Sequence, residues 1–324
     1  SHHPAYHIIK ASGLDKKILD NIRIARNVTT TTPLFADEIR KYNKNVFVLP
    51  NAIDPKEKQF TPNPEKSDRI RIGWLGGSSH LKDLEILNGV VSKLKGDGLI
   101  DKVQFVLCGF DTRGTHTDID SRTGEQKVRN ISPMESVWYR YEKIFTDNYS
   151  IISPEYKNFL MKFTTDEYQN VANEPYRRVW TKPISTYASN YNLFDISLAP
   201  LEENIFNKVK SQLKVIEAGF HHKAIIAQDF GPYKIDLKNA IKFGGGFDES
   251  ANGILVDSKK NHKDWYTALK KLIQNPEMIK VLQENLHNTV KDLYSMENVT
   301  SQRKDLYLQL TKTKKPELWL EKTT

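Results

Sequence analysis

The chain has 324 residues, which is enough for two domains, or for one large domain with attachments, and too many for a single small binding module. Hydrophobic residues make up 38% and charged residues 27%, a composition that excludes collagen-like, low-complexity and wholly disordered proteins. The 48 Lys and Arg against 40 Asp and Glu give a net charge of +8, which suits an anionic ligand, a nucleic acid or an anionic membrane surface without choosing among them.

The cysteine and hydropathy patterns bear on the compartment. The lone Cys108 can form neither an intrachain disulfide nor a thiolate metal site, so we expect a reducing, cytoplasmic location. No apolar run approaches the ~20 residues that cross a bilayer, and the polar start lacks the apolar core of a signal peptide. We therefore expect no integral membrane span, and any membrane association to be peripheral.

The N-terminal part has the pattern of the closing half of an α/β unit. Apolar residues at helical spacing predict a helix over 14–25, and the short β-branched run 28–32 predicts a buried strand. A helix that begins at Pro33 and a second short strand over 46–49 follow. Residues 55–68 are rich in proline and charge and have almost no hydrophobic side chains, which is typical of a linker.

After this linker the alternation of strands and helices starts again. Residues 70–74 predict a strand that a glycine turn joins to a helix, and 103–108 predict a second strand. We expect a polar loop over 109–132, an aromatic-rich helical insertion over about 133–173, and amphipathic helices from 265 to 310. Further strands are predicted at 178–180, 195–199, 224–227 and 254–256. This alternation indicates an α/β fold whose mostly parallel sheet is covered on both faces.

The glycine turn from Gly76 to Lys82 is the first candidate binding site. It lies between a strand and a helix, where backbone N–H groups and the helix dipole favour an anion, and Gly76-Gly77 lets a phosphate approach the backbone. Lys82 is unfavourable for the dipole unless it contacts that phosphate. The alternative is a plain turn with a solvated lysine, and His80 is more often a surface residue than a ligand. The turn matches neither a dinucleotide fingerprint nor a P-loop.

A second candidate site lies on the helix that follows Lys210. Lys210, Ser211, Lys214 and Glu217 share one face at helical spacing, apart from the apolar stripe. Amides, a hydroxyl and ammonium groups at the start of the helix would hold phosphate oxygens, and Glu217 would accept hydrogen bonds from a vicinal diol such as ribose. The alternative is a surface helix with a Lys214–Glu217 ion pair.

Two smaller elements lie near the ends of predicted strands. Gly231-Pro232 follows the strand 224–227, at the edge of the sheet where ligands of open α/β folds bind, although it is equally typical of a simple turn. Arg178 and Trp180 place a cation and an aromatic ring near another strand, and structural packing of Trp180 is the alternative.

In sequence order these motifs resemble those of the GT-B glycosyltransferases, in particular the large family 4, which uses nucleotide-sugar donors. The resemblance extends from Val28 to about Leu293. It implies a Rossmann-like donor domain with a parallel sheet flanked by helices, a partial N-terminal α/β segment before it and helices after it. The motifs that carry it are Val28 to Pro33, Val48-Leu49-Pro50-Asn51-Ala52-Ile53-Asp54, Ile72 to Gly77 with Lys82, Asp195 to Pro200, Lys210 to Gly219, Ala224 to Gly231, and Asn252 to Val256.

The resemblance also implies roles for individual residues. The glycine turn and Lys82 would hold the donor pyrophosphate, Glu217 the ribose hydroxyls, and the Gly231-Pro232 turn the sugar or its phosphate. The backbone near Val179-Trp180 would face the base. The candidate catalytic residues are Lys82, Lys210 and Glu217, and the candidate donor-binding residues are Gly76, Gly77, Ser78, Val179, Trp180, Ser211, Lys214, Gly231 and Pro232.

Two positions depart from the family pattern. Val209 stands where the family has the first glutamate of a pair that ends at Glu217. No arginine precedes Lys82 in the phosphate turn, and Lys210 or Arg178 would take its place. The assignments for the sugar therefore rest on fewer matching residues than those for the nucleotide.

The implied reaction transfers a sugar from a nucleotide diphosphate sugar to an acceptor hydroxyl, with retention of configuration and without a metal or other cofactor. No paired aspartates typical of a metal-bound diphosphate are present, and lysines and backbone dipoles would stabilise the leaving group. The acceptor stays open between a glycan, a lipid-linked glycan, a protein and a nucleic acid. A non-catalytic nucleotide-binding scaffold and a nucleic-acid-associated enzyme are the alternatives; the basic tail at Lys312, Lys314 and Lys315 favours the second.

The chain divides into four predicted parts. They are a remnant of the acceptor-side domain, a linker, the nucleotide-sugar-binding domain, and a C-terminal helix with a basic tail, at 1–54, 55–68, 69–295 and 296–324. Because only about 60 residues precede the second domain, we expect a fragment of a longer enzyme or a site that another subunit completes.

Overall fold

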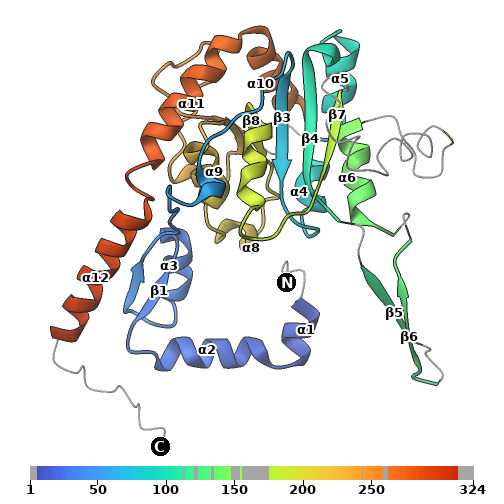
Figure 1. The fold of residues 1–324 in the computed structure, drawn as a ribbon. Coiled ribbons are helices and arrows are strands. Elements are labelled where there is room, and N and C mark those ends of the chain that lie inside the picture. Colours follow the sequence, from blue (N-terminus) through green and yellow to red (C-terminus); the bar gives the residue numbers. More distant parts are fainter. Residues whose placement is uncertain are drawn as a thin grey trace, which may run out of the picture.

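The computed structural model describes residues 6–111, 114–119, 123–132, 135–146, 154, 175–242, 244–257 and 262–312. Its largest element is a six-stranded sheet in the order β10-β9-β8-β3-β4-β7, in which every pair of neighbours is parallel (Figure 1). The strands are β3 (Ile70–Leu75), β4 (Val103–Phe110), β7 (Tyr176–Trp180), β8 (Ile196–Ala199), β9 (Ala224–Gln228) and β10 (Ile254–Val256). The predicted α/β fold with a parallel sheet is confirmed.

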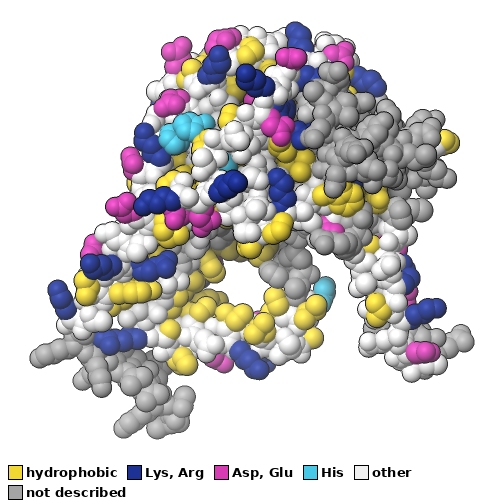
Figure 2. All heavy atoms as spheres, in the orientation of Figure 1, with side chains coloured by type: hydrophobic (Ala, Val, Ile, Leu, Met, Phe, Trp, Pro, Cys, Tyr) yellow, Lys and Arg dark blue, Asp and Glu magenta, His cyan; other side chains and the backbone are white. Residues whose placement is uncertain are grey.

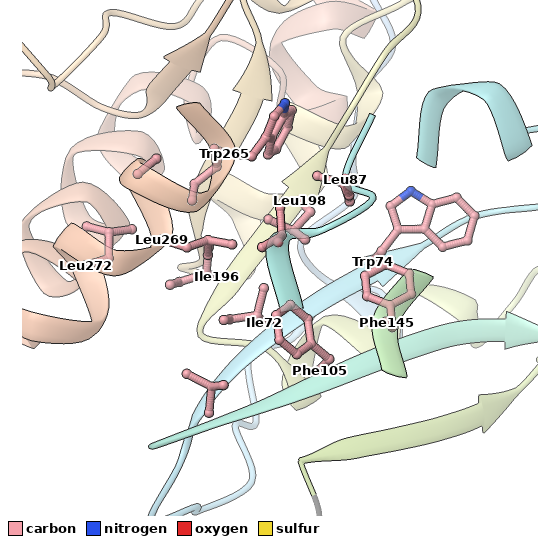
Figure 3. Close-up of a cluster of buried hydrophobic side chains, with 14 of the residues drawn as sticks. Ile72, Trp74, Leu87, Phe105, Phe145, Ile196, Leu198, Trp265, Leu269 and Leu272 are labelled. Atoms are coloured by element: carbon pink, nitrogen blue, oxygen red, sulfur yellow. The ribbon is translucent and has the colours of Figure 1, made fainter. Parts of the chain in front are cut away.

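A hydrophobic core covers each face of this sheet. Successive residues of a strand point to opposite sides, so each strand contributes side chains to both cores. In β4, Phe105 and Leu107 belong to one hydrophobic core, and Val106 and Cys108 belong to the other. Figure 3 shows the first core, where Leu269 and the other labelled side chains of one helix face the side chains of the strands.

Different helices close the two cores. The first core is covered by α5 (Val90–Gly96), α6 (Val137–Thr146) and α10 (His262–Gln274), and the second by α9 (Leu213–Phe220) and the 3-10 segment η4 (Tyr187–Leu193). Side chains of α11 (Pro276–Val290) contribute to both cores. Short helical segments in the connections are α4 (Leu81–Glu85), η2 (Ile100–Lys102), α8 (Ile205–Lys208) and η5 (Gly231–Lys234).

The N-terminal segment forms a second, much smaller unit. It contains α1 (Tyr6–Ala11), α2 (Leu14–Ile24), β1 (Val28–Thr30), α3 (Pro33–Ile39) and β2 (Val46–Val48), and β1 pairs with β2 in parallel. The hydroxyl of Thr32 caps α3 by accepting a hydrogen bond from the Phe35 amide at 3.2 Å. Figure 2 shows an open space between α2 and the six-stranded domain.

The stretch 55–68, which the sequence predicts as a linker, packs against the large domain. It contains η1 (Lys58–Phe60), and the side chains of Gln59 and Phe60 are buried there. The backbone of Ile53 then pairs with the start of the long C-terminal helix α12 (Met296–Lys312), since the Met296 amide donates to the Ile53 carbonyl at 2.8 Å. In Figure 1, α12 runs beside β1.

The region predicted as a polar loop over 109–132 instead contains an antiparallel hairpin, β5 (Thr115–Ile119) and β6 (Gln126–Asn130). The prediction was wrong because β6 is largely exposed, so no hydrophobic alternation marks the strand. Arg129 forms ion pairs with Asp118 and Glu135 at 2.8 and 2.6 Å.

Two sequence predictions concern segments that lie largely outside the described residues. The expected helical insertion over 133–173 contains α6, and most of the rest lies outside the described residues, as do Lys314 and Lys315 of the basic tail.

None of the helices in the described part of the chain has the length and apolar content that a bilayer crossing requires.

Candidate functional site

A cavity of about 750 Å³ opens at the carboxyl ends of the parallel strands. Its lining includes Leu75 at the end of β3, Gly109 near the end of β4, Thr181 directly after β7, Leu201 after β8 and Tyr233 after β9. Ligands of open parallel sheets bind at this edge. The cavity is therefore the first candidate for a binding site in the molecule.

The structure brings together residues from both motifs that the sequence analysis proposed. Six of the twelve candidate residues line the cavity, namely Gly76, Lys82, Lys210, Ser211, Lys214 and Glu217. The other six, Gly77, Ser78, Val179, Trp180, Gly231 and Pro232, are not part of its lining. Two segments separated by about 130 residues in the chain thus form one site.

The candidate residues outside the lining have identifiable surroundings. Val179 lies in the second core, and the Trp180 ring packs edge-on against Phe110 with centroids 5.0 Å apart. Gly231 begins η5 with a φ of 54°, which is a left-handed conformation that favours glycine. Arg178 is buried, and its guanidinium Nε lies 2.6 Å from the Glu142 carboxylate, so this arginine is held in a buried ion pair.

The glycine turn is shaped by a close approach of two backbones. Gly109 has a φ of 101°, and a Cβ at this position would lie 2.4 Å from the carbonyl oxygen of Gly76. Neither the backbone conformation nor the space admits another residue at Gly109. This contact keeps the end of β4 against the turn and brings both glycines to the cavity wall.

Lys214 and Lys210 give this wall its positive charge. The Lys214 ammonium group donates a hydrogen bond to the Leu75 carbonyl and lies 5.2 Å from the centroid of the Trp74 ring. Burial lowers the pKa of Lys214 to about 8, and burial also lowers the pKa of Lys210. A bound phosphate would raise both pKa values again, because it would pair with the charged ammonium groups.

Glu217 lies on the same helix as Lys214 but does not form the surface ion pair that was the alternative interpretation. Its side chain is buried, and its two carboxylate oxygens accept hydrogen bonds from the hydroxyls of Tyr187 and Tyr191, the second at 3.0 Å. Burial raises the pKa of Glu217, against the effect of these hydrogen bonds and of Lys214. Each oxygen keeps acceptor capacity, so a ligand hydroxyl can still bind there.

Sequence reasoning missed an aspartate that organises one side of the cavity. Asp83 is buried, and its Oδ2 lies 2.7 Å from Nδ1 of His80. Its Oδ1 accepts hydrogen bonds from the Glu202 amide at 2.7 Å and from Asn207 Nδ2 at 3.1 Å. Burial is the largest influence on His80 and lowers its pKa, which favours the neutral form of the imidazole. The spacing of His80 and Asp83 was the only local signal for this pair.

Asn190 is a second cavity residue that the sequence did not indicate. It lies on η4 next to Tyr191, its side chain is fully buried, and it lines the cavity. Neither Nδ2 nor Oδ1 has a hydrogen-bond partner among the described residues. A buried amide in this state costs about 1–3 kcal/mol, which a ligand with both a donor and an acceptor would recover.

The arrangement combines groups of complementary chemistry around one volume. Ammonium groups and a glycine turn form one part of the wall, and the Glu217 carboxylate with its partner Tyr187 and an unpaired amide form another. Within the described residues, no group of three or more His, Cys, Asp or Glu could hold a metal ion. A ligand that is anionic at one end and rich in hydroxyls and amide-like edges fits this distribution.

Comparison with solved structures identifies the fold. The chain superposes on sucrose-phosphate synthase from Thermosynechococcus elongatus with a TM-score of 0.56 at 16% identity, covering 90% of this chain and 60% of that one. A glycosyltransferase from Rickettsia africae superposes with a TM-score of 0.57 at 14% identity, covering 89% of this chain and 64% of that one. Anabaena HepE in complex with UDP and glucose superposes with a TM-score of 0.58 at 10% identity, covering 91% of this chain and 66% of that one. The chain has the fold of GT-B glycosyltransferases.

The same comparisons set the extent of the likeness. The chain spans between 60 and 66% of the length of these three structures, and the identities of 10–16% are those of a shared fold. No protein-family model matches the sequence, and no curated protein sequence matches it.

Proposed function

We propose that this chain is the donor-binding part of a GT-B glycosyltransferase of the family 4 type, which transfers a hexosyl group from a nucleotide diphosphate sugar to an acceptor hydroxyl. The observation that carries the proposal is the cavity at the sheet edge, where Lys210 and Lys214 lie in the same lining as Glu217. Solved structures of Anabaena HepE contain UDP or UDP-glucose, and a nucleotide sugar has the charge distribution that this cavity would bind.

The placement of the donor follows from the charges of the wall. The diphosphate would lie against the Gly76 turn, with Lys82, Lys210 and Lys214 as cations and the Ser211 hydroxyl as a donor. The ribose hydroxyls would reach Glu217 beside Tyr187.

In the transfer, the bond between the sugar C1 and the diphosphate oxygen breaks, and a bond between C1 and the acceptor oxygen forms. The acceptor proton leaves with the departing diphosphate. The lysines would stabilise the negative charge that develops on that diphosphate, as preorganised cations do. Retention of configuration and the absence of a metal or other cofactor are part of the proposal because the resemblance to family 4 implies them. A cytoplasmic location is part of the proposal, and the single buried Cys108 is compatible with it.

Nucleotide binding to the full chain tests the proposal. Calorimetric titration with UDP, GDP and ADP should show binding by at least one of them, and Lys214→Met should weaken it by about tenfold or more, because charge-assisted hydrogen bonds contribute about 1.5–3 kcal/mol. Lys208→Ala is the matched control, since this exposed lysine lies two positions from Lys210 and outside the cavity lining.

Two results would count against the proposal. If none of the three nucleotides binds, the donor site is absent. If Lys214→Met and Lys208→Ala weaken binding equally, the cavity is not where the nucleotide sits. Release of free sugar from the matching nucleotide sugar then separates an enzyme from a non-catalytic nucleotide-binding scaffold.

A further inference from the structure

A second cavity, of about 380 Å³, lies between the N-terminal segment and the C-terminal helix. One wall is formed by residues 29–31 and 49–52, where the parallel strands β1 and β2 end. The other wall is one stripe of α12 that includes Thr300, Arg303 and Tyr307. The site thus repeats, on the small sheet, the position at the carboxyl ends of parallel strands that the first cavity has on the large sheet.

The lining of this second cavity combines apolar side chains with neutral hydrogen-bonding groups and one cation. Thr30 is 93% buried, and its hydroxyl has no hydrogen-bond partner among the described residues. The amide of Asn51 and the hydroxyl of Thr300 also belong to the lining. Unpaired buried hydroxyls are uncommon in folded proteins, and here one belongs to a residue that lines a cavity.

The second cavity is lined by a positively charged side chain and by no negatively charged one. Arg303 lines it, no acidic residue does, and Arg303 takes part in no ion pair within the described part of the chain. A guanidinium group binds carboxylate and phosphate through two parallel hydrogen bonds. The exposed ring of Tyr307 adds a flat apolar face to the same wall. These groups suit a hydroxyl-rich ligand that carries one negative charge.

A hydrogen bond connects the two cavities. Asn51 lines the second cavity, and its Nδ2 donates to the hydroxyl of Ser211 at 3.0 Å, while Ser211 lines the first cavity. A ligand in the second cavity is therefore only one side-chain pair away from the wall of the first.

We propose that the second cavity binds a saccharide bearing one phosphate or carboxylate group and, resting on the function proposed above, that this saccharide belongs to the acceptor. The guanidinium of Arg303 pairs with the anionic group, and the hydroxyls of Thr30 and Thr300 bind those of the sugar. A free hydroxyl oxygen of the saccharide then forms the new bond to C1 of the donor as the bond between C1 and the diphosphate oxygen breaks, and the hydroxyl proton leaves with the diphosphate.

The test uses the full chain without nucleotide and four probes: glucose, glucose 6-phosphate, glucuronic acid and inorganic phosphate. We expect glucose 6-phosphate or glucuronic acid to bind at least tenfold more tightly than glucose and inorganic phosphate, as measured by calorimetry or NMR titration. Comparing the affinities for glucose 6-phosphate and glucuronic acid distinguishes a sugar phosphate from the uronic acid of a glycan.

Variants locate the site. Arg303→Gln should weaken binding of the preferred probe at least tenfold, whereas Lys304→Gln, which removes the same charge from the neighbouring position outside the lining, should change it less than twofold. Thr30→Val should weaken binding about fivefold without lowering the melting temperature, because the hydroxyl it removes has no partner in the part of the chain that the structure describes.

The proposal is overturned if no charged probe binds, or if Arg303→Gln and Lys304→Gln have equal effects. Failure of the donor site is recognised separately, by nucleotide titration of the same Arg303→Gln variant, which should bind nucleotide as the parent chain does. If the charged probe binds and no nucleotide does, the saccharide site stands and its assignment to the acceptor falls.

Discussion

The six-stranded domain and the N-terminal segment follow the same α/β pattern but reach very different degrees of closure. In the large domain every strand has neighbours and both faces are covered by helices, whereas the small sheet has two strands and a buried core of Ala36, Ile39 and Val46. The helix α2 buries no residue, and Ile18 and Ile24 are exposed by 48% and 77%. Amphipathic patterning thus predicts a helix but does not ensure that its apolar face finds a partner.

Ion pairs show the sharpest contrast between the two regions. Glu142 and Arg178 are both buried in the large domain, and Tyr176 donates a further hydrogen bond to the same carboxylate at 2.7 Å. Arg40 and Asp37 in the N-terminal segment lie 2.7 Å apart at the surface. Removing one partner of a buried pair leaves an uncompensated charge, while surface pairs contribute little.

The largest effect that we predict uses this contrast. Glu142→Gln should lower the free energy of unfolding by about 3–5 kcal/mol, because the Arg178 charge loses its buried partner. Asp37→Asn should change it by less than about 1 kcal/mol. Urea denaturation followed by tryptophan fluorescence measures both variants, and nucleotide affinity should survive Glu142→Gln at temperatures where that variant is folded. Equal destabilisation by the two variants would remove the distinction between the regions.

A second prediction compares apolar side chains. Leu269 of α10 is fully buried in the first core, and Leu269→Ala should cost about 2–5 kcal/mol of the free energy of unfolding, since the cavity it leaves cannot collapse completely. Ile18→Ala on α2 should cost less than about 0.5 kcal/mol, because half of the side chain is already in water. The same denaturation experiment applies, and a large loss for Ile18→Ala would mean that α2 has a partner in solution.

This contrast also explains which parts of the fold could be predicted from the sequence. Strands that are buried on both faces have continuous apolar runs, so β4 and β9 were located to within about two residues. The hairpin β5–β6 has no such run and was missed. Helical spacing correctly placed Lys214 and Glu217 on α9, but Lys210 and Ser211 precede that helix, so the predicted helix start was wrong. All four residues nevertheless line the first cavity, because they belong to one local segment.

The rest of the candidate site depends on contacts between distant segments. The partners of Asp83 lie 119 and 124 residues away in the chain, at Glu202 and Asn207, and no local spacing encodes them. Asn190 lies on a 3-10 segment without hydrophobic periodicity, so neither its burial nor its place in the cavity follows from the pattern. The roles of all these residues in binding stay predictions.

The smallest predicted effect is a pH dependence that belongs to the large domain. Lys214 has a pKa of about 8 in the folded chain and the ordinary value of about 10.5 when unfolded, so between these values the unfolded chain binds more protons. Below pH 8 Lys214 is charged in the folded chain, and burying this charge lowers the free energy of unfolding by its full amount. As the pH rises above 8 the buried lysine loses its proton, and this loss of stability disappears. The contribution of Lys214 to stability should therefore increase between pH 8 and pH 10.

Nucleotide affinity should change in the opposite direction. An anion in the first cavity favours charged Lys214, so a proton must be taken up on binding above pH 8, and the affinity should fall by about tenfold between pH 7 and pH 9, or about 1.4 kcal/mol. Lys214→Met should bind more weakly at pH 7 and lose most of this dependence, keeping only the part that Lys210 contributes. Lys41→Met, which changes an exposed lysine of the N-terminal segment, should keep it in full. A flat profile in the parent chain would mean that Lys214 does not sense the phosphate, and the cation that does would then be Lys210 or Lys82.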